Sequence, residues 1–550
     1  MEQSHEPLLS SPATCRKSTH RCNALLFTLS LASLICTATL ITVQLNTNTT
    51  TPNPSHLCAN SPSPAPCNAV ISTALSALGR RSKPDPVQVL QTILHQSLLQ
   101  IDSFLTVADN FHRPIDGTGS IQRSALADCI HLMDLSRDLL RDSASAISAE
   151  AYTEARTWLS AALTNHVTCS DGLTRPIGPL MEAHLESLTA LASASLAVLS
   201  AVSPSDGDAI ERVRRFPSWL TVKDRKLLES SSSDGIAANV TVAAEGSGDY
   251  KTVQEAVDSA PDKGKVRYVI YVKEGTYKEN VVVGKKKTNV MIVGDGMNST
   301  VITGSLNVVD GSTTFNSATF AAVGEGFILQ DICIENTAGP EKHQAVALRV
   351  GADRSAINRC RLDGYQDTLY AHSLRQFYRD SVISGTVDFI FGNAAVVFQN
   401  CNLIARKPMS HQQNLVTAQG RVDPNQNTGT SIQSCKVVPS DDLKPVKGSI
   451  PTYLGRPWKE YSRTVFMQSY IDDHVDPKGW MEWSGDFALD TLYYGEYANI
   501  GPGAGTSGRV NWTGYHVITD PNVAKDFTVA GLIQGGTWLQ PTGVAFTEGL

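Results

Sequence analysis

Two aspartates, Asp367 and Asp388, lie 21 positions apart in a stretch that repeats at the same interval. A repeat of that length is typical of a parallel β-solenoid, whose coils stack on one another. Stacking would bring the two residues to about 4.7–4.9 Å, the spacing of neighbouring strands. Two carboxylates that close do not both ionise cheaply, which predicts one proton donor and one base or nucleophile. Two turn aspartates of a purely structural repeat would show the same spacing. The register runs from Cys360, Leu362, Gly364 and Asp367 to Ser381, Ile383, Gly385 and Asp388.

The elements that would position these aspartates are short β-branched runs, which begin after Ala238 and are separated by Gly, Asn and Asp. Helical periodicity is largely absent there, which indicates an all-β region. The phasing continues at Cys401, 20 positions after Ser381, and at Cys435 after a longer loop. This phasing favours a right-handed parallel β-helix over a sandwich. The runs are 266–277, 289–296, 300–305, 320–339, 345–350 and 395–404.

Residues 68–202 have a different period, with apolar residues at three- and four-residue steps. Breakers divide this region into four or five Ala/Leu/Ser-rich helices, which predict an antiparallel four-helix bundle. The expected fold is therefore multidomain, an all-α bundle followed by an all-β helix. Four cysteines in or beside the bundle region make two disulfides plausible in an oxidising compartment: Cys58, Cys67, Cys129 and Cys169.

Residues 24–43 form an uncharged and largely apolar run that follows Arg16, Lys17 and Arg21. Its length fits a membrane signal-anchor, and a cleaved signal peptide is the other option. Either directs the rest of the chain into the secretory pathway. Four N-x-S/T sequons are consistent with that route: Asn48, Asn239, Asn298 and Asn511.

A basic run at residues 216–228 leads into a Ser/Gly-rich stretch, where proteases cut easily. The candidate processing site is Arg225, Lys226, Leu227 and Leu228, although a solvated charge run would look the same. The net charge of −7 and the lack of a long basic tract argue against nucleic acid and against a tight grip on a polyanion. No HExxH motif or Cys-x-x-Cys pair occurs, so we expect neither metal nor cofactor.

Four motifs resemble those of the plant pectin methylesterases (pectinesterases), of the long type in which an inhibitor-like domain precedes the enzyme. The resemblance extends from about residue 54 to residue 550. It implies a secreted cell-wall enzyme that converts methyl-esterified homogalacturonan into pectate and methanol. The motifs are QAVALR (344–349), GYQDTLY (364–370), GTVDFIFGNA (385–394) and LGRPW (454–458).

The resemblance also implies the role of each catalytic residue. Asp388 matches the nucleophile and Asp367 the general acid/base. Gln366 would stabilise the developing oxyanion, and Gln344 could do the same from another coil. Arg456 would hold Asp388 ionised and oriented.

Substrate binding is assigned in the same way. Thr314 and Trp458 match substrate-contacting positions, and Arg456 and Gln344 also line the site. Aromatic residues that could line the groove or pack the core are Tyr370, Phe391, Trp480 and Trp483. The resemblance pairs Cys58 with Cys67 and Cys129 with Cys169.

The expected segments are a cytosolic tail (1–23), an anchor or signal peptide (24–44), a linker (45–53), the inhibitor-like bundle (54–205), a linker with the processing site (206–235) and the catalytic β-helix (236–550). The expected partners are pectin, a processing protease, and the bundle's own or another pectinesterase domain.

Two other functions compete with the esterase. A glycosidase or pectate lyase could use the same fold, but an inverting glycosidase needs carboxylates about 6.5–9.5 Å apart. A lyase would need an acidic calcium cluster, and the sequence offers none near Asp367. A non-catalytic wall protein that inhibits other esterases through its bundle is the third possibility.

Overall fold

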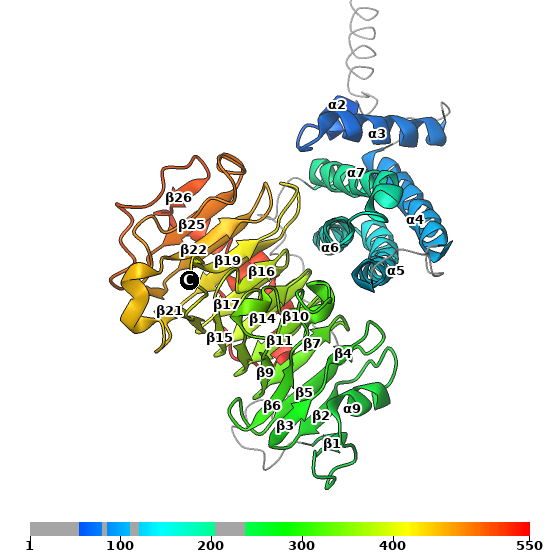
Figure 1. Ribbon diagram of the computed structural model, residues 1–550. Helices are drawn as coiled ribbons and strands as arrows, with labels where there is room; N and C mark the ends of the chain where they lie inside the picture. The colour runs from blue at the N-terminus through cyan, green and yellow to red at the C-terminus, as the bar shows by residue number, and fades with distance from the viewer. Residues whose placement is uncertain (1–53, 80–84, 111–119, 204–236) are drawn as a thin grey trace, which may run out of the picture.

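The computed structural model describes residues 54–79, 85–110, 120–203 and 237–550. It separates into a helical bundle and a long parallel β domain (Figure 1). The expected anchor, both linkers, Asn48 and the Arg225–Leu228 site lie outside the described residues. The helices of the bundle are α2 (Pro54–Leu57), α3 (Pro64–Leu78), α4 (Pro86–Asn110), α5 (Ser120–Ser148), α6 (Tyr152–Gly172) and α7 (Gly178–Val202).

The four long helices α4 to α7 form the predicted bundle, and the shorter α2 and α3 precede it. The structure pairs Cys58 with Cys67 and Cys129 with Cys169, and the second bridge joins α5 to α6. Among the described helices, α7 alone is long and apolar enough to cross a membrane. Since Leu188 and Leu196 on α7 are fully buried among the other helices, its composition serves the bundle core.

The β domain is a parallel β-helix, as predicted, because every paired strand in its three sheets runs parallel to its neighbours. The 11-stranded sheet contains β1 (Val240–Val242), β2 (Tyr268–Val272), β5 (Val290–Gly294), β8 (Ile328–Gln330), β11 (Ser355–Asn358), β14 (Arg375–Arg379), β17 (Ala395–Gln399), β20 (Gly429–Gln433), β23 (Arg463–Met467), β25 (Tyr493–Tyr497) and β26 (Tyr515–Val517).

The other two sheets complete each coil. The 8-stranded sheet contains β3 (Gly275–Lys278), β6 (Thr300–Gly304), β9 (Cys333–Asn336), β12 (Arg361–Asp363), β15 (Val382–Gly385), β18 (Asn402–Ala405), β21 (Lys436–Pro439) and β24 (Tyr470–Ile471). The 7-stranded sheet contains β4 (Val281–Val283), β7 (Phe320–Ala322), β10 (Leu348–Val350), β13 (Leu369–Ala371), β16 (Ile390–Gly392), β19 (Asn414–Gln419) and β22 (Thr452–Pro457).

The register of the coils is the one that the repeat predicts. Leu362 pairs with Ile383, and Leu369 pairs with Ile390, each 21 positions on. In the next coil Val382 pairs with Asn402, so the shorter step to Cys401 is also correct. Because pairing is continuous, a one-residue slip would turn every inward side chain outward.

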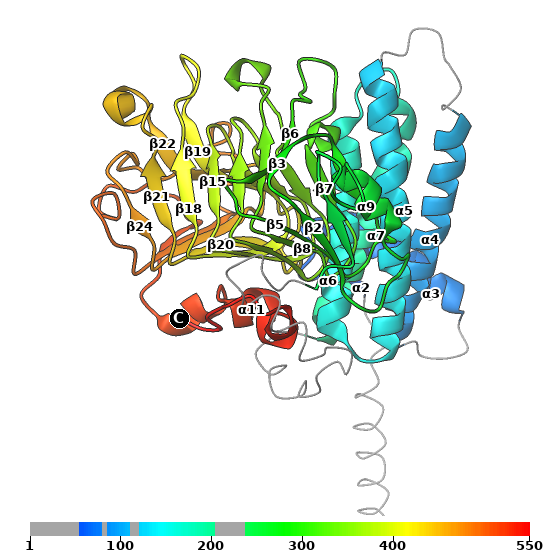
Figure 2. The same cartoon turned by 90° about the horizontal axis from the view of Figure 1, so that it is seen from below.

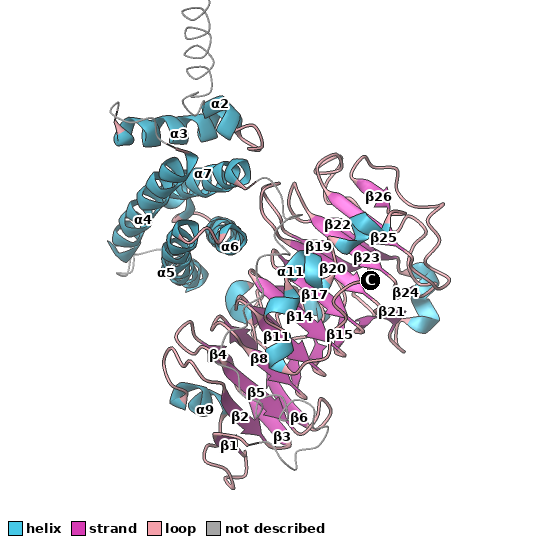
Figure 3. Cartoon of the chain, turned by 180° about the vertical axis from the view of Figure 1, so that it is seen from behind, coloured by secondary structure: helices cyan, strands magenta, loops and turns pink. Residues whose placement is uncertain are grey.

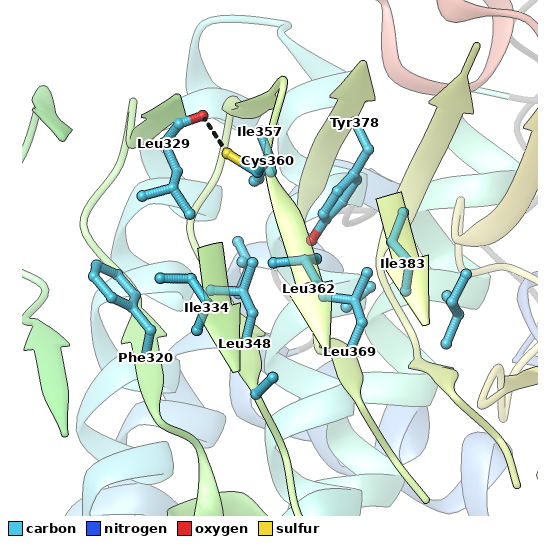
Figure 4. Packing of buried hydrophobic residues seen from close by; sticks show 14 of the residues in the cluster. Phe320, Leu329, Ile334, Leu348, Ile357, Cys360, Leu362, Leu369, Tyr378 and Ile383 are labelled. Carbon is cyan, nitrogen blue, oxygen red and sulfur yellow. Dashed lines mark hydrogen bonds between the residues drawn. The ribbon is translucent and has the colours of Figure 1, made fainter. Parts of the chain in front are cut away.

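Inside the coils, apolar side chains from all three sheets form a continuous core (Figure 4). Leu348 and Leu369 from the 7-stranded sheet meet Ile334 and Leu362 from the 8-stranded sheet. Cys360 lies in the same core, where its Sγ donates to the Leu329 carbonyl oxygen at 3.4 Å. Burial of these apolar side chains is the main contribution that stabilises the stack of coils along the axis of the β-helix.

Two short helices cover the outer face of the 11-stranded sheet near the end of the chain (Figure 2). They are α10 (Pro521–Lys525) and α11 (Val529–Ile533). Val529 and Ile533 pack with Phe377 and Val397 of that sheet. A further short helix, α9 (Val253–Ser259), begins with a capping box formed by Thr252 and Glu255.

The bundle packs against the outer face of the 7-stranded sheet, with α5 and α6 nearest to it (Figures 1 and 3). Ala321, Tyr370 and Phe391, which point outward from that sheet, belong to the same apolar cluster as the core of the bundle. The contact also reaches the start of β14 in the 11-stranded sheet, where Arg375 pairs with Glu154 of α6.

The alternation of inward and outward residues predicts unequal effects of neighbouring substitutions on β12. Leu362 is fully buried and Arg361 is exposed. We expect Leu362→Ala to lower the free energy of unfolding of the β domain by about 2–5 kcal/mol, because it opens a cavity. Arg361→Ala, the control, should cost less than about 1 kcal/mol. Equal effects in denaturant titrations would contradict this register.

Candidate active site

Asp367 and Asp388 lie in equivalent turns, immediately before β13 and β16. Both have left-handed backbones, with φ of 65° and 51°, a conformation that Asp tolerates better than most residues. The Asp367 N–H donates to the Val387 carbonyl oxygen at 3.0 Å, so the two turns stack directly. The turn is crowded, since a Cβ on Gly385 would lie 2.3 Å from Cβ of Phe389. The structure thus brings the predicted pair together on adjacent coils.

Arg456 binds Asp388 with a planar, two-point ion pair. Its Nε donates to Oδ1 at 2.9 Å and its Nη2 to Oδ2 at 2.7 Å. The Trp483 ring lies over the guanidinium, 4.3 Å from the ring centroid. This pair orients the Asp388 carboxylate and favours its ionised form.

Burial and neighbouring charges act differently on the pKa values of the two carboxyl groups. Asp367 is 7% exposed and Asp388 is 6% exposed. Burial and then the neighbouring charge of Asp388 raise the pKa of Asp367 well above its usual value. Burial also raises the pKa of Asp388, but the hydrogen bonds and charge of Arg456 oppose the shift. Asp367 therefore holds its proton more tightly than Asp388 does. Asp388 is the better candidate for the residue that is ionised.

The two candidate glutamines lie on the coil of Asp367 and on the coil before it. Gln366 precedes Asp367, and its carbonyl oxygen accepts from the Ala345 N–H at 3.2 Å. Gln344, the residue before Ala345, is thereby placed on the adjacent coil. Both glutamines are half-buried. Thr314 directly precedes the short 3-10 helix η2 (Phe315–Ser317) beside the 7-stranded sheet, and it is also half-buried.

Three aromatic residues form the floor beside the aspartates. Tyr370 and Phe391 stack with ring centroids 4.1 Å apart, and Trp458 meets Phe391 edge-on at 5.9 Å. Trp480, by contrast, packs in the core of the β-helix. It is 1% exposed, and its Nε1 donates to Glu496 Oε1 at 3.3 Å.

One positioning residue, Arg406, escaped the sequence analysis. Its Nη1 donates to the Gly364 carbonyl oxygen and its Nη2 to the Tyr365 hydroxyl, both at 2.8 Å. Its backbone N–H donates to the Gly385 carbonyl oxygen at 2.7 Å. A single residue therefore ties together the turns that carry both aspartates. The coil register could have identified Arg406, because the residue before it, Ala405, pairs with Gly385.

Helix α6 of the bundle lies directly on the aromatic floor. Thr168 Oγ1 and His372 Nε2 are 2.9 Å apart, and Asn393 donates to Thr164 Oγ1 at 2.9 Å. The space left between α6 and the floor is a cavity of about 10 Å³, which Tyr370 and Trp458 also line. The bundle thus covers Tyr370 and Trp458 of the aromatic floor.

This arrangement defines a class of enzyme, a β-helix esterase with paired aspartates and a preceding helical domain. The chain belongs to the pectinesterase family, whose model matches residues 239–536. A second model, described as plant invertase/pectin methylesterase inhibitor, matches residues 53–198. The expected family and both parts of the expected fold are confirmed.

Relatives support the same assignment. "Pectinesterase 2.1" of Solanum lycopersicum is 58% identical over 90% of each chain. "Pectinesterase/pectinesterase inhibitor 18" of Arabidopsis thaliana is 52% identical over the full length of both. Among solved structures, pectin methylesterase from carrot is 61% identical, with a TM-score of 0.57, and the match covers 58% of this chain and all of that one.

The electrostatic coupling of the pair predicts the effect of removing one charge. We expect Asp388→Asn to lower the pKa of Asp367, because the repelling carboxylate is lost while Arg456 remains. The titration of Asp367 can be followed by carbon-13 NMR of the carboxyl groups. Asp363→Asn, a nearby change on the 8-stranded sheet, is the control and should leave that titration in place. An unchanged Asp367 titration in Asp388→Asn would refute the coupling.

Proposed function

We propose that this chain is a pectinesterase that hydrolyses the C6 methyl esters of homogalacturonan to pectate and methanol. The observation that carries the proposal is the stacked Asp367–Asp388 pair with Arg456 bound to Asp388. The alternatives fit this site less well. Roughly one strand spacing separates the aspartates, less than an inverting glycosidase requires.

In the first step, the Asp388 carboxylate attacks the ester carbonyl carbon of a galacturonate unit. The tetrahedral intermediate collapses to an acyl-enzyme anhydride, and the C–O bond to the methoxy group breaks. Asp367, held protonated by burial and by the charge beside it, gives its proton to the departing methanol.

In the second step, a water attacks the anhydride and Asp367 takes its proton. Hydrolysis restores the Asp388 carboxylate and leaves the free uronate. The side-chain N–H of Gln366 donates a hydrogen bond to the oxyanion that develops in both steps, and Gln344 can add a second donor. Arg456 keeps Asp388 aligned, while Trp458 offers an apolar face to a sugar ring and Thr314 a polar contact.

We also propose that the bundle restrains the enzyme of its own chain. The cavity of about 10 Å³ between α6 and the floor, with Trp458 in its lining, leaves no room for a sugar ring. Ion pairs strengthen the contact. Oε2 of Glu154 in the bundle lies 2.6 Å from Arg375 Nη2 and 3.0 Å from Arg354 Nη2. Arg375 is 1% exposed and also binds Asp353, so the centre of the cluster is shielded from solvent.

The remaining assignments complete the proposal. The chain enters the secretory pathway through residues 24–44, as an anchored or cleaved precursor, and acts in the cell wall. A protease cuts at Arg225–Leu228 and separates residues 54–205 from residues 236–550. Asn239, Asn298 and Asn511 are exposed and accessible to glycosylation, and Asn48 is the fourth sequon.

The mechanism predicts that Asp388→Asn abolishes methanol release. We expect kcat to fall by roughly 10⁴-fold, because the amide is a poor nucleophile of the same shape. Asp363→Asn is the matched control and should stay close to the parent. Methanol from pectin and polymer length should be measured together. Shortened or unsaturated oligomers would reject the esterase, and methanol release by Asp388→Asn would reject the proposed nucleophile.

The restraint by the bundle predicts low activity of the full chain and a rise after cleavage within residues 206–235. Thr164→Arg places a charge in the contact with Asn393 and should raise full-chain methanol release several-fold, since overpacking weakens an interface. Thr106→Arg, on the exposed face of α4, is the control. Equal activity of the intact and cleaved chains would exclude restraint.

A further inference from the structure

A row of cations, Arg349, Lys285 and Lys263, leads away from the aromatic floor toward the first coils of the β-helix, and the catalytic mechanism uses none of them. Arg349 lies in register with Tyr370, and the pairing continues through Phe391 and Ala418 to Arg456. Arg349 is therefore four strand spacings, roughly 19 Å, from Arg456. Beyond it, Lys285 follows β4, at the first-coil end of the same sheet.

Arg349 is buried and incompletely paired. It is 5% exposed, and its Nε and Nη1 find no hydrogen-bond partner among the described residues. The Phe315 ring lies under its guanidinium at 3.4 Å. Buried N–H groups without an acceptor are costly, so two donors of Arg349 are available to an anionic ligand.

The row ends at a second cavity, which shares no lining residue with the cavity beneath α6. Its volume is about 350 Å³, enough for a sugar ring. Successive turns that lead into strands of the 11-stranded sheet form one wall, and the end of the chain forms the other. Four cations and one carboxylate contribute to the lining, together with an indole ring: Lys263, Lys265, Arg267, Arg354, Glu325 and Trp538.

In the full chain, acidic residues of α5 lie along this row. Asp134 and Asp138 each bind Lys285 Nζ at 2.6 Å. The charge of Lys263 acts on Asp142, one turn further along. At the other end, Asp128 accepts from Thr313 Oγ1 at 2.6 Å, and its charge acts on Arg349. Arg137 and Arg141 pair along α5 itself, with Asp134 and Asp138.

The helix thus presents a series of carboxylates to a row of cations, as a linear polyanion would. We propose that Arg349, Lys285, Lys263 and the adjoining cavity bind a stretch of free galacturonates, and that α5 occupies this site in the precursor. The inference rests on the proposed function and deepens it, because free galacturonates are the product of the reaction. A polymer that spans about 19 Å could keep its deesterified stretch here while the next ester reaches Asp388.

The test uses residues 237–550 with Asp388→Asn, which cannot turn over. The carrot enzyme matches over its full length with 58% of this chain, about the share that residues 237–550 make up, which indicates that this region folds independently. The probe is a long unesterified oligogalacturonate, titrated by calorimetry at low and high salt. The test variant is Lys263→Gln/Lys265→Gln/Lys285→Gln. The control, Lys436→Gln/Lys444→Gln/Lys447→Gln, removes the same charge around β21 and the turn that follows it.

We expect roughly tenfold weaker binding for the test variant at low salt and less than twofold for the control, since each surface contact contributes modestly and salt screens it. The difference should shrink at high salt. Equal losses in both variants, or none, would overturn the inference, and matched thermal unfolding would exclude misfolding. Methanol release by the unsubstituted 237–550 chain tests the proposed function separately, so the two can fail independently.

Discussion

Parallel pairing between successive coils is the constraint on which the rest of this structure depends. It places Leu362 over Ile383 in the core, and the same register places the turn of Asp367 over that of Asp388. Core packing and catalytic geometry therefore cannot vary independently. Arg406 reinforces the link, because it binds the Gly364 and Gly385 carbonyl oxygens at the start of both turns.

The register alone would leave two equivalent carboxyls. Arg456 makes them different, since it binds Asp388 at two points and leaves Asp367 to carry the effect of burial and of its neighbour's charge. A symmetric repeat thus becomes an asymmetric pair by one side chain from β22, two coils further on. Trp483, 37% exposed, covers the guanidinium and limits its contact with water.

The parts of the molecule that follow a sequence period could be predicted. The bundle, the coils and the stacked aspartates all repeat at intervals that are visible in the chain. The position of Arg456 could not be derived that way, because a longer loop precedes its coil, and only the resemblance identified it. Contacts between the domains have no period at all. Glu154 and Arg375 are 221 residues apart, and only the docked arrangement shows that they meet.

The net charge of the chain likewise carries no information about where charges gather. The net charge of −7 is a sum over the chain, whereas Lys263, Lys265 and Arg267 lie within a few residues of one another at one corner. Asp134 and Asp138, which pair with Lys285 near the same corner, belong to another domain. A summed charge cannot distinguish a neutral surface from two complementary ones.

The position of α6 on the aromatic floor has a kinetic consequence. While the domains share one chain, the covering helix is held at an effective concentration that is independent of how dilute the protein is. Once the connection is cut, the same contacts have to hold together two separate molecules, and their occupancy falls on dilution. Cleavage and dilution would then act in series, so that a cut enzyme stays covered while its two parts are concentrated and is uncovered once they are dilute.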